Sequence, residues 1–234
     1  FGGFRSSCTS NLVPAGGILN CPDYTRTCQC MYQNQTSLAL VHMPDIEMWN
    51  EFDFGQGEAP VARVGINFGA PGDRLADSGT LWLDYPSVGG RSPDVPVRVE
   101  PEGIQYYRHH ATALRGDGLR WVSASGCEGV TAITVRLGSK DETETERPYT
   151  VRLYFAETEG AKQGDRVFSV ALQGKKVIKN LDITKSAGGS NRTLVREFKG
   201  IRVKNDLTIA LRPAPTPANR KPIICGIEAV AETN

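Results

Sequence analysis

The sequence predicts an all-β protein, a β-sandwich or jelly roll with a small N-terminal appendage. Short apolar segments alternate with polar residues at a period of two, and no segment sustains the period of a helix. The 234 residues include 25 glycines and 14 prolines, which favour many turns between short strands. With 39% hydrophobic and 23% charged residues, the composition is that of an ordinary globular protein.

The first 60 residues differ from the rest, because they combine turn-forming sequences with one strand candidate, Leu38–Met43. We expect a Cys-rich N-terminal segment at residues 1–50, followed by an acidic, aperiodic linker at 51–60. The β-sandwich then occupies residues 61–234. A chain of this length accommodates one sizeable β domain and an appendage.

Six cysteines predict disulfides and therefore an oxidising, extracytoplasmic compartment. Zinc is the weaker alternative, because the spacing is C-x-C and lacks paired C-x2-C motifs. The four N-terminal cysteines allow three pairings, among which the sequence does not choose. The other two lie on core-like strands, where a bridge between neighbouring strands is expected. The cysteines are Cys8, Cys21, Cys28, Cys30, Cys127 and Cys225.

Beyond residue 60, apolar and polar residues alternate most clearly in three segments. Val151, Leu153 and Phe155 share one face of the first segment. Val167–Gln173 and Leu207–Leu211 repeat the pattern. Further strand candidates are Ala62–Phe68, Leu119–Ser123, Ala132–Leu137, Thr193–Phe198, Ile201–Lys204 and Ile223–Val230. Two polar stretches, 140–147 and 212–222, are expected to be loops.

The second half of the chain resembles the core strands of malectin and malectin-like domains, in both order and spacing. Four segments carry this resemblance: YTVRLYFAE (149–157), GDRVFSVALQGKKVIKNLDI (164–183), LVREFKGIRVKNDLTIAL (194–211) and KPIICGIEAV (221–230). Residues 63–90 resemble the opening strand and first ligand loop of that family. The resemblance spans about residues 60–230. It implies a jelly-roll β-sandwich with sugar bound in a shallow cleft formed by loops at one end.

The resemblance also implies which residues contact the sugar. Asp84 and Tyr85 match the first aromatic position, and Tyr106 or Tyr107 matches the second. The loop after YFAE, where malectin presents an aromatic pair, contains Glu159 here, and the late aspartate of the family falls near Arg220. Aromatic rings stack on the C–H faces of a pyranose, while carboxylates accept hydrogen bonds from its hydroxyls. The candidate ligand-binding residues are Trp82, Asp84, Tyr85, Tyr106, Tyr107, Glu159 and Arg220. Core packing is the alternative for Trp82 and for Trp121.

The N-terminal block, GGFRSSCTSNLVPAGGILN with CQCMYQNQTSLALVHMP, resembles the closing segment of large secreted bacterial proteins that carry quinoprotein-like β-propellers. This resemblance implies that residues 1–50 are the end of a propeller. The malectin-like part would then be its C-terminal appendage.

Other functional classes receive little support. The formal net charge of +1 argues against nucleic-acid binding, and no apolar run approaches the roughly 18 residues needed to insert into a membrane. The sequence contains no G-x-S-x-G, P-loop or H-E-x-x-H motif, so we expect neither an enzyme nor a cofactor. Asp73, Asp77 and Asp84 are a minor calcium alternative to ordinary turn-forming aspartates. Adjacent His109 and His110 on a strand would face opposite sides, which disfavours chelation.

The resulting hypothesis is a non-catalytic carbohydrate-binding module, which targets or anchors a larger secreted protein to an oligo- or polysaccharide. The alternative is a structural or protein-interaction module of a large extracytoplasmic assembly. Such a module would dock on a β-propeller or a neighbouring subunit and would have no sugar site.

Overall fold

The computed structural model describes residues 12–21, 38–41, 47–50, 59–89, 92–139, 146–215 and 220–232. The chain forms two compact units, Phe1–Ile46 and Glu47–Asn234. The described residues of the first unit form an antiparallel sheet in the order β1-β2-β3. Its strands are β1 (Val13–Ala15), β2 (Ile18–Cys21) and β3 (Leu38–Val41). Cys21 is buried in this unit. Cys8, Cys28 and Cys30 lie outside the described residues, so the N-terminal disulfides stay a prediction.

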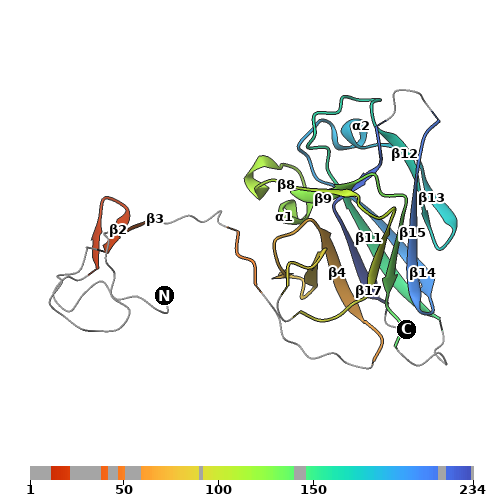
Figure 1. Ribbon diagram of the computed structural model, residues 1–234, viewed down its shortest axis with the longest axis horizontal. Coiled ribbons are helices and arrows are strands. Elements are labelled where there is room, and N and C mark those ends of the chain that lie inside the picture. Colours follow the sequence, from red (N-terminus) through yellow and green to blue (C-terminus); the bar gives the residue numbers. More distant parts are fainter. Residues whose placement is uncertain are drawn as a thin grey trace. The chain divides into compact units, whose positions relative to one another are not determined.

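The second unit is a β-sandwich, as the period-two pattern predicts (Figure 1). One layer has six strands in the order β14 (Leu194–Val203), β11 (Arg147–Phe155), β17 (Gly226–Ala231), β4 (Arg63–Phe68), β6 (Leu81–Tyr85) and β5 (Arg74–Leu75). The other has five, in the order β13 (Lys175–Asp182), β12 (Val167–Leu172), β15 (Asp206–Pro213), β10 (Ala132–Arg136) and β7 (Val97–Glu100). All pairs in these layers are antiparallel except β4 with β6.

The described residues of this unit also form a small third sheet and three short helices. The sheet has the order β16 (Ile223–Ile224), β9 (Ser125–Glu128) and β8 (Gln105–Arg108). The helices are the 3-10 helix η1 (Ala111–Ala113), α1 (Arg120–Ser123) and α2 (Ile183–Ala187). His110 precedes η1, and its Nδ1 accepts a hydrogen bond from the Thr112 amide at 3.3 Å. The histidine therefore caps this helix.

The main core lies between the two large sheets, and the predicted inward faces are confirmed. Leu153 and Phe155 of β11 are 0% exposed, as is Phe168 of β12. Leu207 and Leu211 of β15 are 0% and 1% exposed. A side chain two residues along a strand returns to the same face, so each strand contributes a row of apolar groups to one shared layer. Two predicted strands, at 193–198 and 201–204, are joined into the single strand β14.

A second apolar cluster covers the outer face of the six-stranded sheet. It includes Trp82 of β6, Tyr154 of β11 and Val122 of α1. The strand predicted at Leu119–Ser123 is wrong, because Arg120–Ser123 form α1 and Leu119 is its N-cap residue. Leu119, at the N-cap, and Val122, three residues later, both pack in the cluster around Trp82. A pattern of apolar and polar residues only five positions long does not distinguish a single helical turn from a short strand.

Two glycines make room for the Trp82 indole. A Cβ at Gly65, which is paired with Trp82 across β4 and β6, would lie 2.2 Å from Trp82 Cδ2. A Cβ at Gly226 of β17 would lie 2.9 Å from Trp82 Cζ3. Trp82 is 0% exposed as a result. The largest aromatic side chain of this cluster thus lies flat on glycine backbone.

The expected bridge between Cys127 and Cys225 is not formed, and both cysteines are buried free thiols. Cys127 of β9 pairs directly with Ile224 of β16, so Cys225 is one position out of register. Successive side chains of an extended chain point to opposite faces. Cys127 accordingly belongs to the main core, whereas Cys225 belongs to the second cluster. Burial raises the pKa of the Cys225 thiol to about 12.

Substituting Gly65→Ala tests the glycine floor beneath Trp82. The added methyl group would overlap the indole, and such overpacking typically costs about 1–3 kcal/mol of unfolding free energy. We expect a lower thermal midpoint for the loss of near-UV tryptophan dichroism. Lys176→Ala, on the exposed edge strand β13, serves as the control and should leave the midpoint unchanged. An unchanged midpoint in Gly65→Ala would mean that Trp82 is free to move away.

Candidate functional site

The end of β6 presents two of the predicted contact residues on opposite faces. Tyr85 packs against the main core, and its ring meets Phe68 edge to face at 5.9 Å between centroids. Asp84 points to the other side of the sheet, because adjacent strand residues alternate. The Tyr106 ring of β8 lies 6.3 Å from that of Tyr85. The structure thus brings Tyr85 and Tyr106 together as a partly buried aromatic pair.

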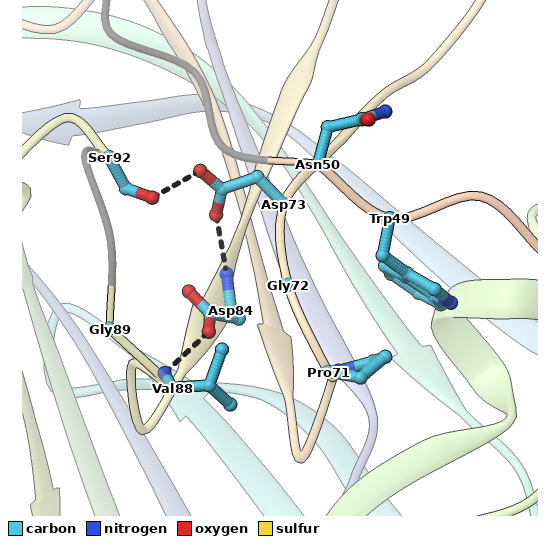
Figure 2. A pocket seen from close by; sticks show the side chains of 9 residues that line it. All are labelled: Trp49, Asn50, Pro71, Gly72, Asp73, Asp84, Val88, Gly89 and Ser92. Carbon is cyan, nitrogen blue, oxygen red and sulfur yellow. Dashed lines mark hydrogen bonds between the residues drawn. The ribbon is translucent and has the colours of Figure 1, made fainter. Parts of the chain in front are cut away.

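A pocket of about 220 Å³ opens on the Asp84 side of this strand end (Figure 2). Its polar groups are held by hydrogen bonds. Asp73 Oδ1 accepts the Asp84 amide at 3.2 Å, and Asp73 Oδ2 accepts the Ser92 hydroxyl at 2.5 Å. Asp84 Oδ2 accepts the Val88 amide at 2.7 Å. The lining residues are Trp49, Asn50, Pro71, Gly72, Asp73, Asp84, Val88, Gly89 and Ser92.

The charge of Asp73 acts on the neighbouring carboxyl group of Asp84. Burial raises the pKa of Asp84 above its ordinary value of 3.8, and the nearby charge of Asp73 raises it further. The hydrogen bond from the Val88 amide acts in the opposite direction, because it stabilises the charged form. Asp84 is 7% exposed and Asp73 is 1% exposed. Both are therefore positioned acceptors at the base of a small pocket.

A second pocket of about 330 Å³ lies on the Tyr85 side. Asp84 and Ser92 line both pockets. The second pocket has Ile66 and Leu83 at its base and the segment Pro93–Val97 along one side. The two pockets therefore share a polar boundary at Asp84 and Ser92.

Tyr107 is separated from Tyr106 by the alternation of β8. Its hydroxyl lies 3.5 Å from Cys225 Sγ. Burial raises the pKa of Tyr107 well above 10, and the nearby cysteine adds to the effect. The phenol therefore anchors β8 on the second cluster, and it does not join the Tyr85–Tyr106 pair.

Glu159 and Arg220 contact each other at the surface. Arg220 Nη1 donates to the Glu159 carbonyl at 2.9 Å, and His109 Nε2 lies 3.0 Å from Glu159 Oε1. Neither Glu159 nor Arg220 lines either pocket beside Asp84. The positions where the resemblance implies an aromatic pair and an aspartate are thus occupied by residues that bind one another.

The structure places Trp82 differently from its predicted role as a ligand contact. It is fully buried, with its ring 5.1 Å from Tyr154 and 5.8 Å from Trp121, edge to face in both cases. A side chain with no exposed surface has none to offer a sugar, so Trp82 supports the site from beneath. The core-packing alternative describes it correctly.

Trp49, Asn50 and Ser92 are pocket residues that the sequence reasoning missed. Trp49 and Asn50 precede the predicted linker, but they lie in the second unit, where Asn50 pairs with Asp73 through main-chain hydrogen bonds of 2.9 Å. The available signal was an aromatic residue directly before an acidic, aperiodic stretch. That signal does not reveal that Asn50 pairs with Asp73.

Metal binding has no further support from the geometry. Across the described parts of the chain, no three His, Cys, Asp or Glu side chains are grouped to hold a metal ion. Asp77 is exposed and lines neither pocket beside Asp84, so it does not join Asp73 and Asp84 as the minor calcium alternative requires.

Among the helices of the described residues, none is long and apolar enough to span a membrane.

Comparison with known families and curated proteins gives one match. The family model for the malectin domain matches residues 142–215, a segment that runs from β11 through β15. No curated protein matches significantly. The match covers the resembling segments at 149–157, 164–183 and 194–211, whereas it does not reach the segment at 221–230. Nothing found supports the propeller-like N-terminal block.

Solved structures share the fold at low sequence identity. The beta-glucuronidase of Bacteroides uniformis matches with a TM-score of 0.53 and 13% identity, over 73% of this chain and 18% of that chain. The plant receptor-like kinase FER matches with a TM-score of 0.52 and 17% identity, over 74% and 42%. The ANXUR2 extracellular domain from Arabidopsis thaliana matches with a TM-score of 0.51 and 18% identity, over 73% and 41%. This chain thus spans less than half of each of those chains.

Replacing Asp84→Asn tests the electrostatics of the first pocket. A raised pKa means that the folded state holds this proton more readily than the unfolded state, so ionisation destabilises the fold as pH rises. We expect a higher thermal midpoint than wild type at pH 7, because the amide is neutral and its oxygen still accepts the Val88 amide. The difference should vanish below about pH 3.8, where the unfolded side chain is also protonated. Asp77→Asn is the control, and a gain independent of pH would contradict the interpretation.

Proposed function

We propose that the second unit is a non-catalytic carbohydrate-binding module, which targets or anchors a larger extracytoplasmic protein to a glycan. The observation that carries this proposal is the Tyr85–Tyr106 ring pair beside two pockets that share Asp84. The malectin match over 142–215 supports it independently. The compartment is inferred from the cysteine content and from the extracellular domain among the structural neighbours.

The residues of this region suit the two kinds of surface on a pyranose. The partly buried rings of Tyr85 and Tyr106 provide an apolar platform for the C–H face. Asp84 accepts hydrogen bonds from hydroxyls, while the buried Asp73 holds the Asp84 main chain and Ser92 in place. Preorganised acceptors lose little conformational entropy on binding, which favours recognition of a weakly bound ligand.

We assign no catalytic step to these carboxylates. Glycoside hydrolysis needs two carboxyl groups that flank the scissile bond. Asp73 and Asp84 lie next to each other and are linked through the Asp84 amide (Figure 2), so they approach a ligand from one side. The structural match to beta-glucuronidase covers 18% of that enzyme's chain. It supports a shared fold and carries no catalytic role to this chain. We infer no cofactor for this function.

A structural or protein-interaction module is the second candidate. The contact of Arg220 and His109 with Glu159 favours it, because these residues satisfy one another where the family resemblance implies sugar contacts. The partner would be a β-propeller or a neighbouring subunit of the same assembly. This candidate requires no sugar at the Tyr85–Tyr106 pair, so a binding experiment separates the two.

A glycan array probed with the full 234-residue chain tests the proposal. We expect saturable binding to one glycan class. The double substitution Tyr85→Ala with Tyr106→Ala should weaken that binding about tenfold or more, since each ring contributes roughly 0.5–1.5 kcal/mol.

Phe198→Ala is the matched control, because it removes a partly buried ring from β14, at the far edge of the six-stranded sheet. Near-UV dichroism confirms that each variant is folded. If the folded wild-type protein binds no glycan on a broad array, the lectin function is rejected and the interaction module is favoured.

A further inference from the structure

One wall of the pocket in Figure 2 comes from a segment that precedes the first strand of the sandwich. Trp49 and Asn50 line this pocket together with residues from the loops around β5 and β6. Asn50 and Asp73 exchange two main-chain hydrogen bonds of 2.9 Å. Glu47 Oε1 accepts the Ala111 amide at 2.5 Å. The segment 47–50 is therefore fastened to the sandwich at two points.

The Trp49 ring is held in a defined orientation. It meets the edge of Trp121 at 5.8 Å between centroids, with an interplanar angle of 83°. The Arg74 guanidinium lies 5.7 Å from the Trp49 centroid and 4.7 Å from that of Trp121. Such cation–π and edge contacts stabilise partly exposed rings. Gly72 permits the close approach, because a Cβ there would lie 3.3 Å from Trp49 Cβ.

The size and chemistry of this pocket suit one sugar ring. Its volume of about 220 Å³ is below the roughly 300–1,000 Å³ of pockets for drug-sized ligands. It combines one indole with the carboxylates of Asp73 and Asp84 and the hydroxyl of Ser92. Such an aromatic wall with fixed acceptors matches a pyranose, which is apolar on its faces and rich in hydroxyl donors at its rim.

We propose that Trp49 completes a sugar-binding site in the first pocket, next to the Tyr85–Tyr106 pair. This site takes a neutral sugar unit of the bound glycan. This inference rests on the proposed function and adds its ligand class. The pocket accepts neutral hexoses because their hydroxyls donate to Asp84, whose main chain Asp73 holds in place. It excludes uronic acids, since a third carboxylate would be brought against two buried ones.

The three tryptophans of the chain, Trp49, Trp82 and Trp121, provide a direct readout. We would follow their indole N–H signals by NMR in the full chain during titration with cellotetraose, maltotetraose, β-1,4-galactotetraose and trigalacturonate. A neutral tetrasaccharide should shift the Trp49 signal saturably, while trigalacturonate should not.

Trp49→Ala should weaken binding of that tetrasaccharide about three- to tenfold, while Trp49→Phe keeps a ring and stays within about twofold of wild type. Met48→Ala, which alters the neighbouring side chain that is 69% exposed, should bind as wild type. If a neutral sugar binds through Tyr85 and Tyr106 but Trp49 neither shifts nor matters, the Trp49 pocket is rejected and the lectin function stands. Equally tight binding of trigalacturonate overturns the ligand class. Absence of binding of any sugar to folded protein overturns both proposals.

Discussion

The burial of Trp82 on glycine backbone is the constraint from which the candidate site is built. Gly65 and Gly226 leave space for the indole against two neighbouring strands, and Tyr154 and Trp121 close around its edges. Trp121 is in turn covered by Arg74, whose guanidinium also lies over Trp49. A fully buried ring in the second apolar cluster is thus connected by direct contacts to a ring that lines the first pocket. The Trp49 side of the pocket is therefore supported by the packing of Trp82, Trp121 and Arg74.

Strand alternation at the end of β6 explains how one short segment serves two pockets. Tyr85 faces the main core and meets Tyr106, whereas Asp84 faces the pocket that Asp73 also lines. The raised pKa of Asp84 reflects the same placement, because the carboxyl group is both desolvated and close to a like charge. A glycan lying across this strand end would meet an aromatic platform on one side and fixed acceptors on the other.

The surface formed by Glu159, Arg220 and His109 shows how a shared fold can carry a different contact set. Their mutual hydrogen bonds occupy positions where the malectin resemblance implies ligand contacts. In our proposal Trp49 supplies the further aromatic contact that these positions lack, in addition to the Tyr85–Tyr106 pair. The solved structures of similar fold, at 13–18% identity, illustrate the same separation, since function resides in sites placed on a fold.

The sequence by itself determined the sandwich and its inward faces, because an alternating pattern such as Val151–Phe155 reports directly which side of a strand is apolar. Through the malectin resemblance it also named Asp84, Tyr85 and Tyr106 or Tyr107 as candidate contact residues, and the structure pairs Tyr85 with Tyr106. Tertiary structure alone decided that Arg120–Ser123 forms a helix, that Cys127 and Cys225 face apart, and that Trp82 is buried. It alone brought Trp49 to the pocket, through the pairing of Asn50 with Asp73. The physical reason is that periodicity is a local property, whereas pairing partners and burial depend on residues distant in the chain.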